Sequence, residues 1–382
     1  MAENYFPSAK DFDEMGDHLE AIATALLDEI YVDPYSSSWA TVQKAVRAGV
    51  APHVIPVGTK LRATHKVYGT IWCDVVAHNH YKSADYENVY TMTLMCSNAI
   101  TSLPFDSREA FYYADEELPA GTYHFTVPTT CGSWLAGTYQ FTLQYPLPAG
   151  GQLCIRDNSS TPLESSLVTA FINITDDFST QSSGIVVGSD GANLGTFGVE
   201  LNHINRVAYG SNNYKESDVR QFLNSSETMG YVWSPQTKFD RPPSWIISLD
   251  GFANGLDEDL LGVIGRVIVP CVANRYYESP DSTLELSEKY TLLDKFYLPS
   301  LTEMLGEAHS YDEDGSTQLP YFEDSPAVDR VKRDSIFVPR TYWSRNSYTK
   351  SECINHIIDT TGNNTIANAM NNHHVAPMFN IV

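Results

Sequence analysis

Residues 342–382, YWSRNSYTKSECINHIIDTTGNNTIANAMNNHHVAPMFNIV, carry the strongest indication of the fold. Asparagine, serine, threonine, tyrosine and histidine fill the middle of this stretch. They offer hydrogen-bond donors and acceptors at lower entropic cost than lysine or glutamate. Asparagine-rich composition also occurs in disordered, aggregation-prone tails. Here apolar residues bracket the stretch, because Tyr342 and Trp343 open it and Val375–Val382 has the pattern of a closing strand. The pattern therefore favours polar loops displayed on a buried frame.

The chain has 382 residues and a formal net charge of -23, and its length allows two or three domains. A surface this acidic repels phosphate backbones, which argues against a nucleic-acid partner. No apolar run reaches membrane-spanning length, and no signal peptide precedes Asp11. We therefore expect no membrane insertion, and synthesis in a cytoplasm from which lysis could release the protein.

Six cysteines are scattered along the chain, at Cys73, Cys96, Cys131, Cys154, Cys271 and Cys353. No pair has C-x-x-C spacing, which excludes a zinc ribbon and a thioredoxin-type motif. The even number would permit three disulfides, but the scattered placement favours reduced, buried thiols.

Two further groups contain residue types that bind metals. His78 and His80 alternate along a predicted strand and share a face, but no neighbouring Asp or Cys completes a ligand set. Asp312, Asp314 and Gly315 resemble the start of a calcium loop. The glutamate that an EF-hand requires is missing, so we interpret them as a solvated acidic loop. We expect neither a metal nor a cofactor.

Residues 1–56 are predicted to form a helical segment that attaches or oligomerises the protein. Within residues 9–32 an apolar stripe consists of Phe12, Met15, Leu19, Ile22, Leu26 and Ile30. The stripe fits a helix packed on its own domain, but its heptad-like spacing favours a short coiled coil. Asp33-Pro34 ends this helix, and a second helix is predicted over Trp39–Ala48.

From residue 57 the pattern changes to strands. Two strand-like runs lie within Lys60–His80, with Gly69 near the turn between them. Residues 101–185 contain short aromatic strands punctuated by Pro-Ala-Gly turns. They predict a small β-sandwich that is a spacer or an insert in a larger domain. Residues 176–196 have the Ser, Gly and Asp content of a linker.

Residues 195–382 contain short helices followed by short strands and long loops, a pattern typical of α+β domains. The predicted helices are Lys215–Leu223 and Asp257–Arg266. The predicted strands are Val267–Val272, Lys295–Leu298, Ser335–Pro339 and Val375–Val382.

Five segments of this block follow one another in an order that resembles a known family. They are RVAYGSNNYKESDVRQFLNS (206–225), DGFANGLDEDLL (250–261), FYLPSLTEM (296–304), YWSRNS (342–347) and HVAPMFNIV (374–382). Together they resemble a C-type-lectin-like domain that is common in gut bacteria and their phages. Several relatives are variable proteins of diversity-generating retroelements, including a phage tropism determinant at a tail-fibre tip. The resemblance covers 195–382 and extends into 57–100, where IWCDVVAHNH (71–80) resembles the domain's first strands.

The resemblance implies that the N- and C-terminal strands of the domain pair. It also implies that the region between Trp343 and Val375 is an exposed ligand-binding face, within a display region of residues 343–380. The calcium-dependent sugar motifs of animal C-type lectins, E-P-N and W-N-D, are absent, so the resemblance implies no calcium lectin.

Relatives diversified by a retroelement suggest which residues of this face bind ligand. Adenine-directed diversification of Asn codons cannot give Lys, Glu or Met, which excludes Lys350, Glu352 and Met370. The candidate ligand-binding residues are Asn346, Tyr348, Asn355, His356, Asp359, Asn363, Asn364, Thr365, Asn368, Asn371 and Asn372.

The expected function is that of a phage-encoded receptor-binding or virion surface protein. Its polar C-terminal face would bind a host-cell-surface protein or glycan, and its N-terminal segment would bind other virion proteins. The alternative is a structural head or tail decoration fibre with no essential ligand. A formylglycine-generating-type enzyme shares the lectin-like fold but is less favoured. The chain has no G-x-S-x-G, Walker, dinucleotide or H-E-x-x-H motif, so we expect no catalytic residues.

The N-terminal pattern predicts the oligomeric state. The stripe from Phe12 to Ile30 is too apolar for an isolated exposed helix, so we expect the full chain to form a homo-oligomer, with a trimer as the preferred form. The mass in solution of the full chain, compared with that of a chain beginning at Val57, checks this. A full-length monomer at micromolar concentration would contradict it.

Overall fold

The computed structural model describes residues 32–33, 35–107 and 209–382, together with short segments between 112 and 153 and residues 192–193. Within 209–382 it leaves out 238–239, 241–242, 275–286, 307–311, 350 and 352. The helix predicted over residues 9–32 lies outside the described residues except for Val32, and most of the predicted linker does too.

A six-stranded antiparallel sheet joins the first hundred residues to the C-terminal strand. Five strands form a path in the order β1 (Lys60–His65), β2 (Gly69–His78), β3 (Met92–Cys96), β20 (Met378–Ile381) and β10 (Ile264–Gly265). The sixth strand, β13 (Phe296–Tyr297), also pairs with β20. In the register of β3 and β20, Leu94 lies opposite Phe379. The expected pairing of N- and C-terminal strands is therefore confirmed.

A second sheet of five strands contains most of the predicted display region. Its order is β18 (Asn364–Asn368), β17 (Ile354–Ile358), β16 (Tyr342–Ser347), β19 (His373–His374) and β4 (Ser102–Leu103). The β16–β19 pair is parallel, and the other pairs are antiparallel. All six residues of β16 are buried. The expectation that the exposed face begins directly after Trp343 is therefore wrong.

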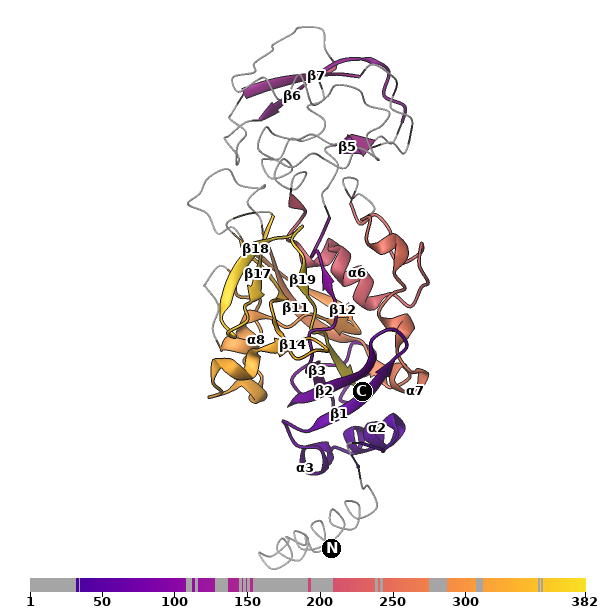
Figure 1. Cartoon of the computed structure of the whole chain (residues 1–382), viewed down its shortest axis with the longest axis vertical. Coiled ribbons are helices and arrows are strands. Elements are labelled where there is room, and N and C mark those ends of the chain that lie inside the picture. The colour runs from indigo at the N-terminus through magenta and orange to yellow at the C-terminus, as the bar shows by residue number, and fades with distance from the viewer. Residues whose placement is uncertain are drawn as a thin grey trace, which may run out of the picture.

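A hairpin of β11 (Val267–Asn274) and β12 (Ser287–Asp294) packs beside β16. Figure 1 shows this hairpin at the centre of the molecule. Two side chains of β16 bind the backbone of β11. Arg345 Nε donates to the Pro270 carbonyl at 2.8 Å, and Ser347 Oγ donates to the Val272 carbonyl at 3.2 Å. These bonds fix the second sheet against the hairpin, because buried polar groups need partners.

The helix α2 (Trp39–Arg47) confirms the prediction over Trp39–Ala48 and belongs to the core. Ser38 caps it, and its buried side chains are Trp39, Val42, Ala45 and Val46. Gln43 Nε2 donates to the Val382 carbonyl at 2.7 Å. The short helix α3 (Ala51–Val54) follows, and Figure 1 places both helices beneath β1 and β2. A chain that begins at Val57 lacks these contacts, so the oligomer test is better made with a chain that begins at Val32.

The remaining helices are short. They are α6 (Asp218–Asn224), α7 (Glu258–Leu261) and α8 (Leu301–Leu305), with 3-10 turns η3 (Tyr214–Glu216), η4 (Ile246–Ser248), η5 (Ala253–Gly255), η7 (Pro320–Phe322) and η8 (Ala327–Arg330). The prediction over Lys215–Leu223 is confirmed in position by η3 and α6. The helix predicted over Asp257–Arg266 is too long. Gly262 ends α7, and Ile264 already belongs to strand β10, where it pairs with Ile381 of β20.

The strand predicted over Ser335–Pro339 is also wrong. Residues 335–338 lie in the turn of a hairpin between β14 (Lys332–Arg333) and β15 (Pro339–Arg340), so only Pro339 of the predicted strand is in a strand. The mixture of helices and mainly antiparallel strands confirms the α+β class. The four described cysteines, Cys73, Cys96, Cys271 and Cys353, are buried and free as predicted, and Cys131 and Cys154 lie outside the described residues.

Two small sheets lie within the block predicted as a β-sandwich. One pairs β5 (Tyr112–Tyr113) with β8 (Gln152–Leu153), and the other has the order β7 (Gly137–Leu143), β6 (Gly121–Val127) and β9 (Ala192–Asn193). Because β9 falls inside the segment predicted as a linker, that linker prediction is wrong at residues 192–193. In Figure 1 these sheets lie at the end of the molecule opposite α2 and α3.

Buried carboxylates hold the two points where this block leaves and rejoins the core. Ser107 N donates to Asp218 Oδ2 at 2.8 Å, and Ser211 N donates to Asp106 Oδ2 at 2.7 Å. Asp218 N also donates to Asp106 Oδ1 at 3.3 Å. Burial raises the pKa of Asp218 to about 7, and the charge of Asp240 acts in the same direction, against the hydrogen bond from Ser107.

The raised pKa of Asp218 predicts that stability depends on pH. The folded state favours the protonated carboxyl, so this contribution is full below the unfolded pKa near 3.8 and is lost as pH rises through about 7. The substitution Asp218→Asn keeps an acceptor for Ser107 without a titrating group. We expect the melting temperature of the native chain to fall relative to that of D218N between pH 5 and pH 8. Parallel pH profiles of the two chains would contradict this.

Candidate functional site

A fully buried arginine lies at the centre of the YWSRNS segment. Arg345 forms ion pairs with Glu303 Oε1 at 2.6 Å and Asp314 Oδ2 at 2.9 Å, and all three side chains are 0% exposed. It also donates to the Leu298 carbonyl at 2.9 Å and to Ser316 Oγ at 2.8 Å. Burial alone would lower the pKa of Arg345, but the two carboxylates hold it above its usual value. The guanidinium therefore stays charged and joins β16 to α8 and to the loop around residue 314.

Glu303 has a second role at the start of α8. It forms a capping box with Ser300, in which the Ser300 side chain accepts from the Glu303 backbone and the Glu303 side chain accepts from Ser300 N. Tyr81 donates its hydroxyl to the same carboxylate. Because every oxygen of Glu303 is engaged with the protein, this arginine and carboxylate act as a frame and leave no free group for chemistry.

Asp312 is the centre of a second buried polar group. Its carboxylate accepts from His356 Nε2 at 2.9 Å, from Thr349 N at 3.0 Å and from Thr349 Oγ1 at 2.7 Å. Burial would raise the pKa of Asp312, but these hydrogen bonds hold it below its usual value. As whole residues, Asp312 and Asp314 are only 2% and 3% exposed. The interpretation of this segment as a solvated acidic loop is therefore wrong for both carboxylates.

Three of the predicted ligand-binding residues are buried and belong to the frame. Asn346 accepts from Leu301 N at 2.8 Å and donates to the Asp312 carbonyl at 2.7 Å. Asn355 donates to the Ser344 carbonyl at 3.1 Å. His356 is 1% exposed and lies between Asp312 and Asn364. Assigning these three residues to an exposed face is therefore wrong, because all three side chains are buried and each forms at least one hydrogen bond within the protein.

The other predicted residues reach the surface, and we call them the display surface. Its exposed members are Asn363, Thr365, Asn371 and Asn372, and its half-buried members are Tyr348, Asp359, Asn364 and Asn368. Most of them lie on β18 or in the turns before and after it. Among the described strands, β18 pairs only with β17 and is thus an edge strand. Ile366, 45% exposed, adds an apolar contact in the middle of this edge.

Short-range bonds fix the turns of the display surface. Asp359 Oδ1 accepts from Thr361 N at 2.8 Å, from Thr361 Oγ1 at 2.7 Å and from Asn363 N at 3.0 Å. After β18, Met370 N donates to the Tyr209 carbonyl at 2.9 Å. The turn that carries Asn371 therefore lies beside the point where the chain returns from the insert. Such an arrangement presents amides and hydroxyls in fixed positions, which suits the recognition of a polar surface.

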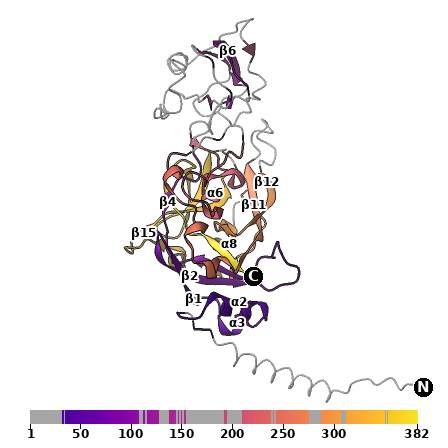
Figure 2. The same ribbon diagram turned by 90° about the vertical axis from the view of Figure 1, so that its right-hand side faces the viewer.

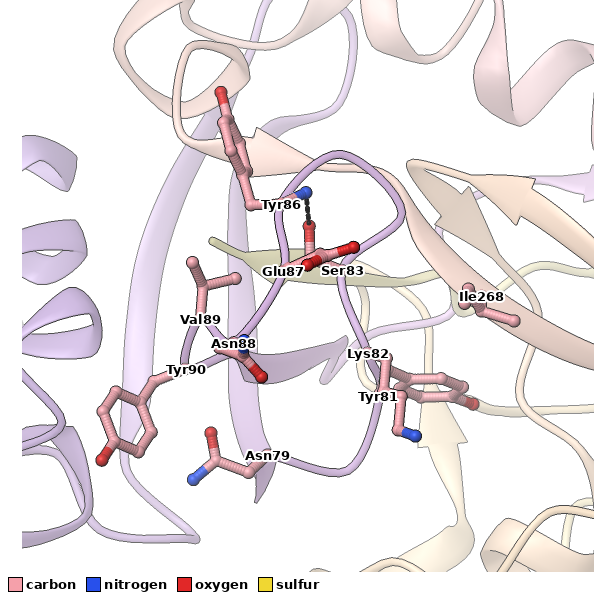
Figure 3. Close-up of a pocket in the computed structure, with 10 residues that line it drawn as sticks. All are labelled: Asn79, Tyr81, Lys82, Ser83, Tyr86, Glu87, Asn88, Val89, Tyr90 and Ile268. Carbon is pink, nitrogen blue, oxygen red and sulfur yellow. Dashed lines mark hydrogen bonds between the residues drawn. The ribbon is translucent and has the colours of Figure 1, made fainter.

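A separate groove, which sequence patterns did not reveal, lies between the β2–β3 loop and β11. Its volume is about 670 Å3, within the usual range for ligand pockets. The lining residues are Asn79, Tyr81, Lys82, Ser83, Tyr86, Glu87, Asn88, Val89, Tyr90 and Ile268. In Figure 3, Asn79 and Asn88 lie opposite each other across the base of the loop, while Tyr86 and Tyr90 project from it in different directions.

Backbone bonds tie this loop to the hairpin. Ile268 N donates to the Lys82 carbonyl at 3.0 Å, and Ala84 N donates to the Arg266 carbonyl at 2.8 Å. The segment HNHYKSADYENVY (78–90) has three tyrosines and two asparagines, which could have pointed to a binding loop. Only the fold shows that a distant residue, Ile268, closes its other side. The lining of the groove combines aromatic rings and amides with one side chain of each charge, Lys82 and Glu87.

Within the described residues, no group of three or more His, Cys, Asp or Glu side chains lies close enough to hold a metal ion. His78 instead contacts the Ile55 carbonyl at 3.0 Å. None of the described helices has both the length and the apolar character that crossing a membrane requires.

The fold and site define a mixed α+β protein with a buried ionic frame and an exposed polar edge. A family model described as a domain of unknown function, DUF6273, matches residues 182–382, just over half of the chain. The chain therefore belongs to the DUF6273 family. Comparisons with curated proteins and with solved structures give no match. The match begins before residue 195 and does not include β1 to β3, although β3 pairs with β20.

The division between frame and display surface predicts different costs of substitution. Asn346→Ala leaves Leu301 N and the Asp312 carbonyl without partners and should cost about 1–3 kcal/mol of unfolding free energy. Trp343→Ala empties a fully buried site and should cost roughly 3–5 kcal/mol. The control Asn371→Ala, at an exposed position, should cost under about 0.5 kcal/mol. Equal losses in chemical denaturation across the three variants would contradict the division.

Proposed function

We propose that this protein is a phage-encoded receptor-binding or virion surface protein whose display surface binds a host-cell-surface protein or glycan. The observation that carries the proposal is the split within one short segment. Its buried polar residues are bonded to the frame, whereas its exposed polar residues line an edge strand and its turns. A rigid scaffold that presents adaptable polar side chains is the usual arrangement of a recognition surface.

A C-type-lectin-like fold is part of the proposal. The antiparallel pairing of β3 with β20 and the burial of Trp343 and Arg345 support it, since the W-x-R segment and the closing strand are features that the resemblance rests on. The frame lets the exposed residues of the display surface, Asn363, Thr365, Asn371 and Asn372, change without loss of the fold, because these side chains contribute little to the core. That tolerance suits a protein whose ligand differs between hosts.

The arrangement of the chain also supports attachment at one end and binding at the other. In Figure 2, α2 and α3 lie at one end of the molecule, and β6 of the insert lies at the far end. The contact between Met370 and Tyr209 places part of the display surface on the side of the insert. Attachment through residues 1–56, as a trimer, would direct several copies of this surface outward. Multivalent binding would then compensate for weak single sites.

The ligand contacts would come mainly from hydrogen bonds around one apolar centre. Asn363, Thr365, Asn371 and Asn372 are exposed and offer amides and hydroxyls, each worth about 0.5–1.5 kcal/mol net. Tyr348 packs edge-to-face on His356 at 5.6 Å between ring centroids, so only part of its ring is free to contact a ligand. Several residues must therefore act together for useful affinity.

The proposal predicts that purified protein adsorbs to cells of a susceptible bacterial strain through the display surface. We expect joint substitution of Asn363, Thr365, Asn371 and Asn372 by alanine to reduce adsorption at least about ten-fold, since several hydrogen bonds are lost together. EDTA should leave adsorption unchanged. Flow cytometry of labelled protein on a panel of gut bacterial strains measures both effects.

A matched control separates the display surface from the groove of Figure 3. The variant with Tyr86→Ala and Asn88→Ala removes exposed side chains from that groove and should adsorb like the native chain. Adsorption lost in the groove variant but kept in the display variant would overturn the assignment. Adsorption to none of the strains would favour a decoration fibre without an essential ligand.

A further inference from the structure

A second groove lies on the outer side of the first sheet, beside the β14–β15 hairpin. Its volume is about 350 Å3, and its lining residues are Tyr35, Lys60, Trp72, Ser97, Asn98, Val331, Arg333 and Phe337. Figure 2 shows the hairpin that carries β15 at the side of the molecule. This groove shares no residue with the display surface, and its character is basic and aromatic.

The basic character stands out in so acidic a chain. Lys60 and Arg62 occupy exposed positions on β1, and in the register of the sheet Arg62 lies opposite Trp72. Lys332 and Arg333 come from β14. Lys332 is buried, so the accessible cations are Lys60, Arg62 and Arg333, three of only 24 lysines and arginines in a chain with a net charge of -23. The groove is therefore a local exception to the overall charge.

Few carboxylates oppose these cations. Asp74 is buried and lies 2.6 Å from Lys60 Nζ and 3.6 Å from Lys332 Nζ, so one carboxylate faces two ammonium groups. The carboxylate of the hairpin itself, Asp334, is paired with Arg340 at 2.7 Å. In the part of the chain that the structure describes, Arg62 has no ion pair. A net positive charge thus remains at the groove.

The aromatic side of the groove is exposed and held in place. Phe337 is 77% exposed with a φ of 64°, a backbone conformation that is rare for a bulky residue. Asp334 Oδ1 accepts from Ile336 N and from Val338 N, both at 3.0 Å, and Arg333 Nη1 donates to the Phe337 carbonyl at 3.0 Å. The turn therefore presents three consecutive apolar side chains to solvent in a fixed conformation, which is typical of an interaction site.

The opposite wall of the groove is also aromatic. Tyr35 packs edge-to-face on Trp72, with 5.8 Å between ring centroids, and it is 68% exposed. Three rings and a set of cations thus surround a space large enough for one side chain and its neighbouring charges. Rings of this kind contact an apolar side chain, and arginines pair with carboxylates.

We propose that this groove binds a short acidic peptide segment of a partner protein, with one aromatic or aliphatic side chain seated among Tyr35, Trp72 and Phe337. Carboxylates on either side of that residue pair with Arg62 and Arg333. Charge complementarity selects this partner against a basic one. A long polyanion is disfavoured because it would extend past the groove onto an acidic surface, and screening acts over only about 8 Å at physiological ionic strength. The inference does not depend on the proposed receptor-binding function.

The test uses the full chain and three pools of short fluorescein-labelled peptides, read by fluorescence polarisation. One pool is acidic with Phe, Trp or Leu, one is acidic with only Gly and Ser, and one is basic with Phe, Trp or Leu. We expect binding of the first pool alone, weakened by added salt. Equal binding of the acidic pools, or preference for the basic pool, would overturn the proposal.

Variants locate the binding. Arg62→Gln and Phe337→Ser should each weaken binding of the first pool about ten-fold. Among the described residues, the side chain of Arg62 takes part in no hydrogen bond or ion pair, so we expect Arg62→Gln to leave the fold intact, which its melting temperature checks. The matched controls Lys82→Gln and Tyr231→Ser remove an exposed cation and an exposed ring elsewhere and should bind normally. Unchanged binding in both groove variants would overturn the proposal. So would a fall in oligomer mass with Phe337→Ser, because it would identify a second copy of the chain as the occupant.

Discussion

The buried charge of Arg345 is the constraint on which the second half of the structure depends. Its guanidinium reaches two carboxylates and two backbone carbonyls that lie far apart in the sequence, at Glu303, Asp314, Pro270 and Leu298. Removing one partner of such a cluster leaves an uncompensated buried charge, which typically costs about 3–5 kcal/mol. The cluster also fixes the relative orientation of the elements it joins. The N–H groups of the planar guanidinium point in fixed directions, so its partners can take few alternative positions. Position and orientation of β16, α8 and the β11 hairpin therefore follow from one side chain.

A frame of this kind explains how a segment can be rich in polar residues and still be ordered. The inward-facing amides of β16 and β17 complete the hydrogen bonds of neighbouring backbone, as Asn346 does for Leu301. Farther along the chain, exposed side chains such as those of Thr365 and Asn371, on β18 and in the turn after it, remain in contact with water. The same residue type thus fixes the fold at one position and is free for recognition a few positions later. Buried and exposed positions of this segment have the same residue types. Whether a side chain faces the core or the solvent decides its role.

Elements with one buried apolar face could be predicted from the sequence, because that burial imposes a regular spacing of apolar residues. The apolar spacing predicted α2, because burial of one helix face leaves a clear pattern, whereas the pairing of β3 with β20 was expected from the family resemblance. Asn346, Asn355 and His356 were wrongly assigned to the surface. Residue type alone does not distinguish a polar residue in a sheet that is covered on both faces from one at the surface. The prediction of a solvated loop at Asp312 and Asp314 failed for a similar reason, because their hydrogen-bond and ion-pair partners are distant in the sequence. The groove of Figure 3 needs Ile268, far from its loop in sequence, and no local pattern could indicate it.

The position of β20 between β3 and β10 has a consequence for how the chain reaches its folded state. Thr93 and Asn380, joined by a side-chain hydrogen bond across this pair, are 287 residues apart. All five residues of β3 are buried once β20 is in place. Until residues 378–381 have been synthesised, β3 is an apolar edge with no partner on that side. Folding of so non-local a sheet is slow, and an open edge of this kind invites pairing with other chains. The nascent chain is therefore vulnerable to aggregation from the synthesis of β3 until β20 pairs with it, and assistance from chaperones would have its greatest effect in that interval.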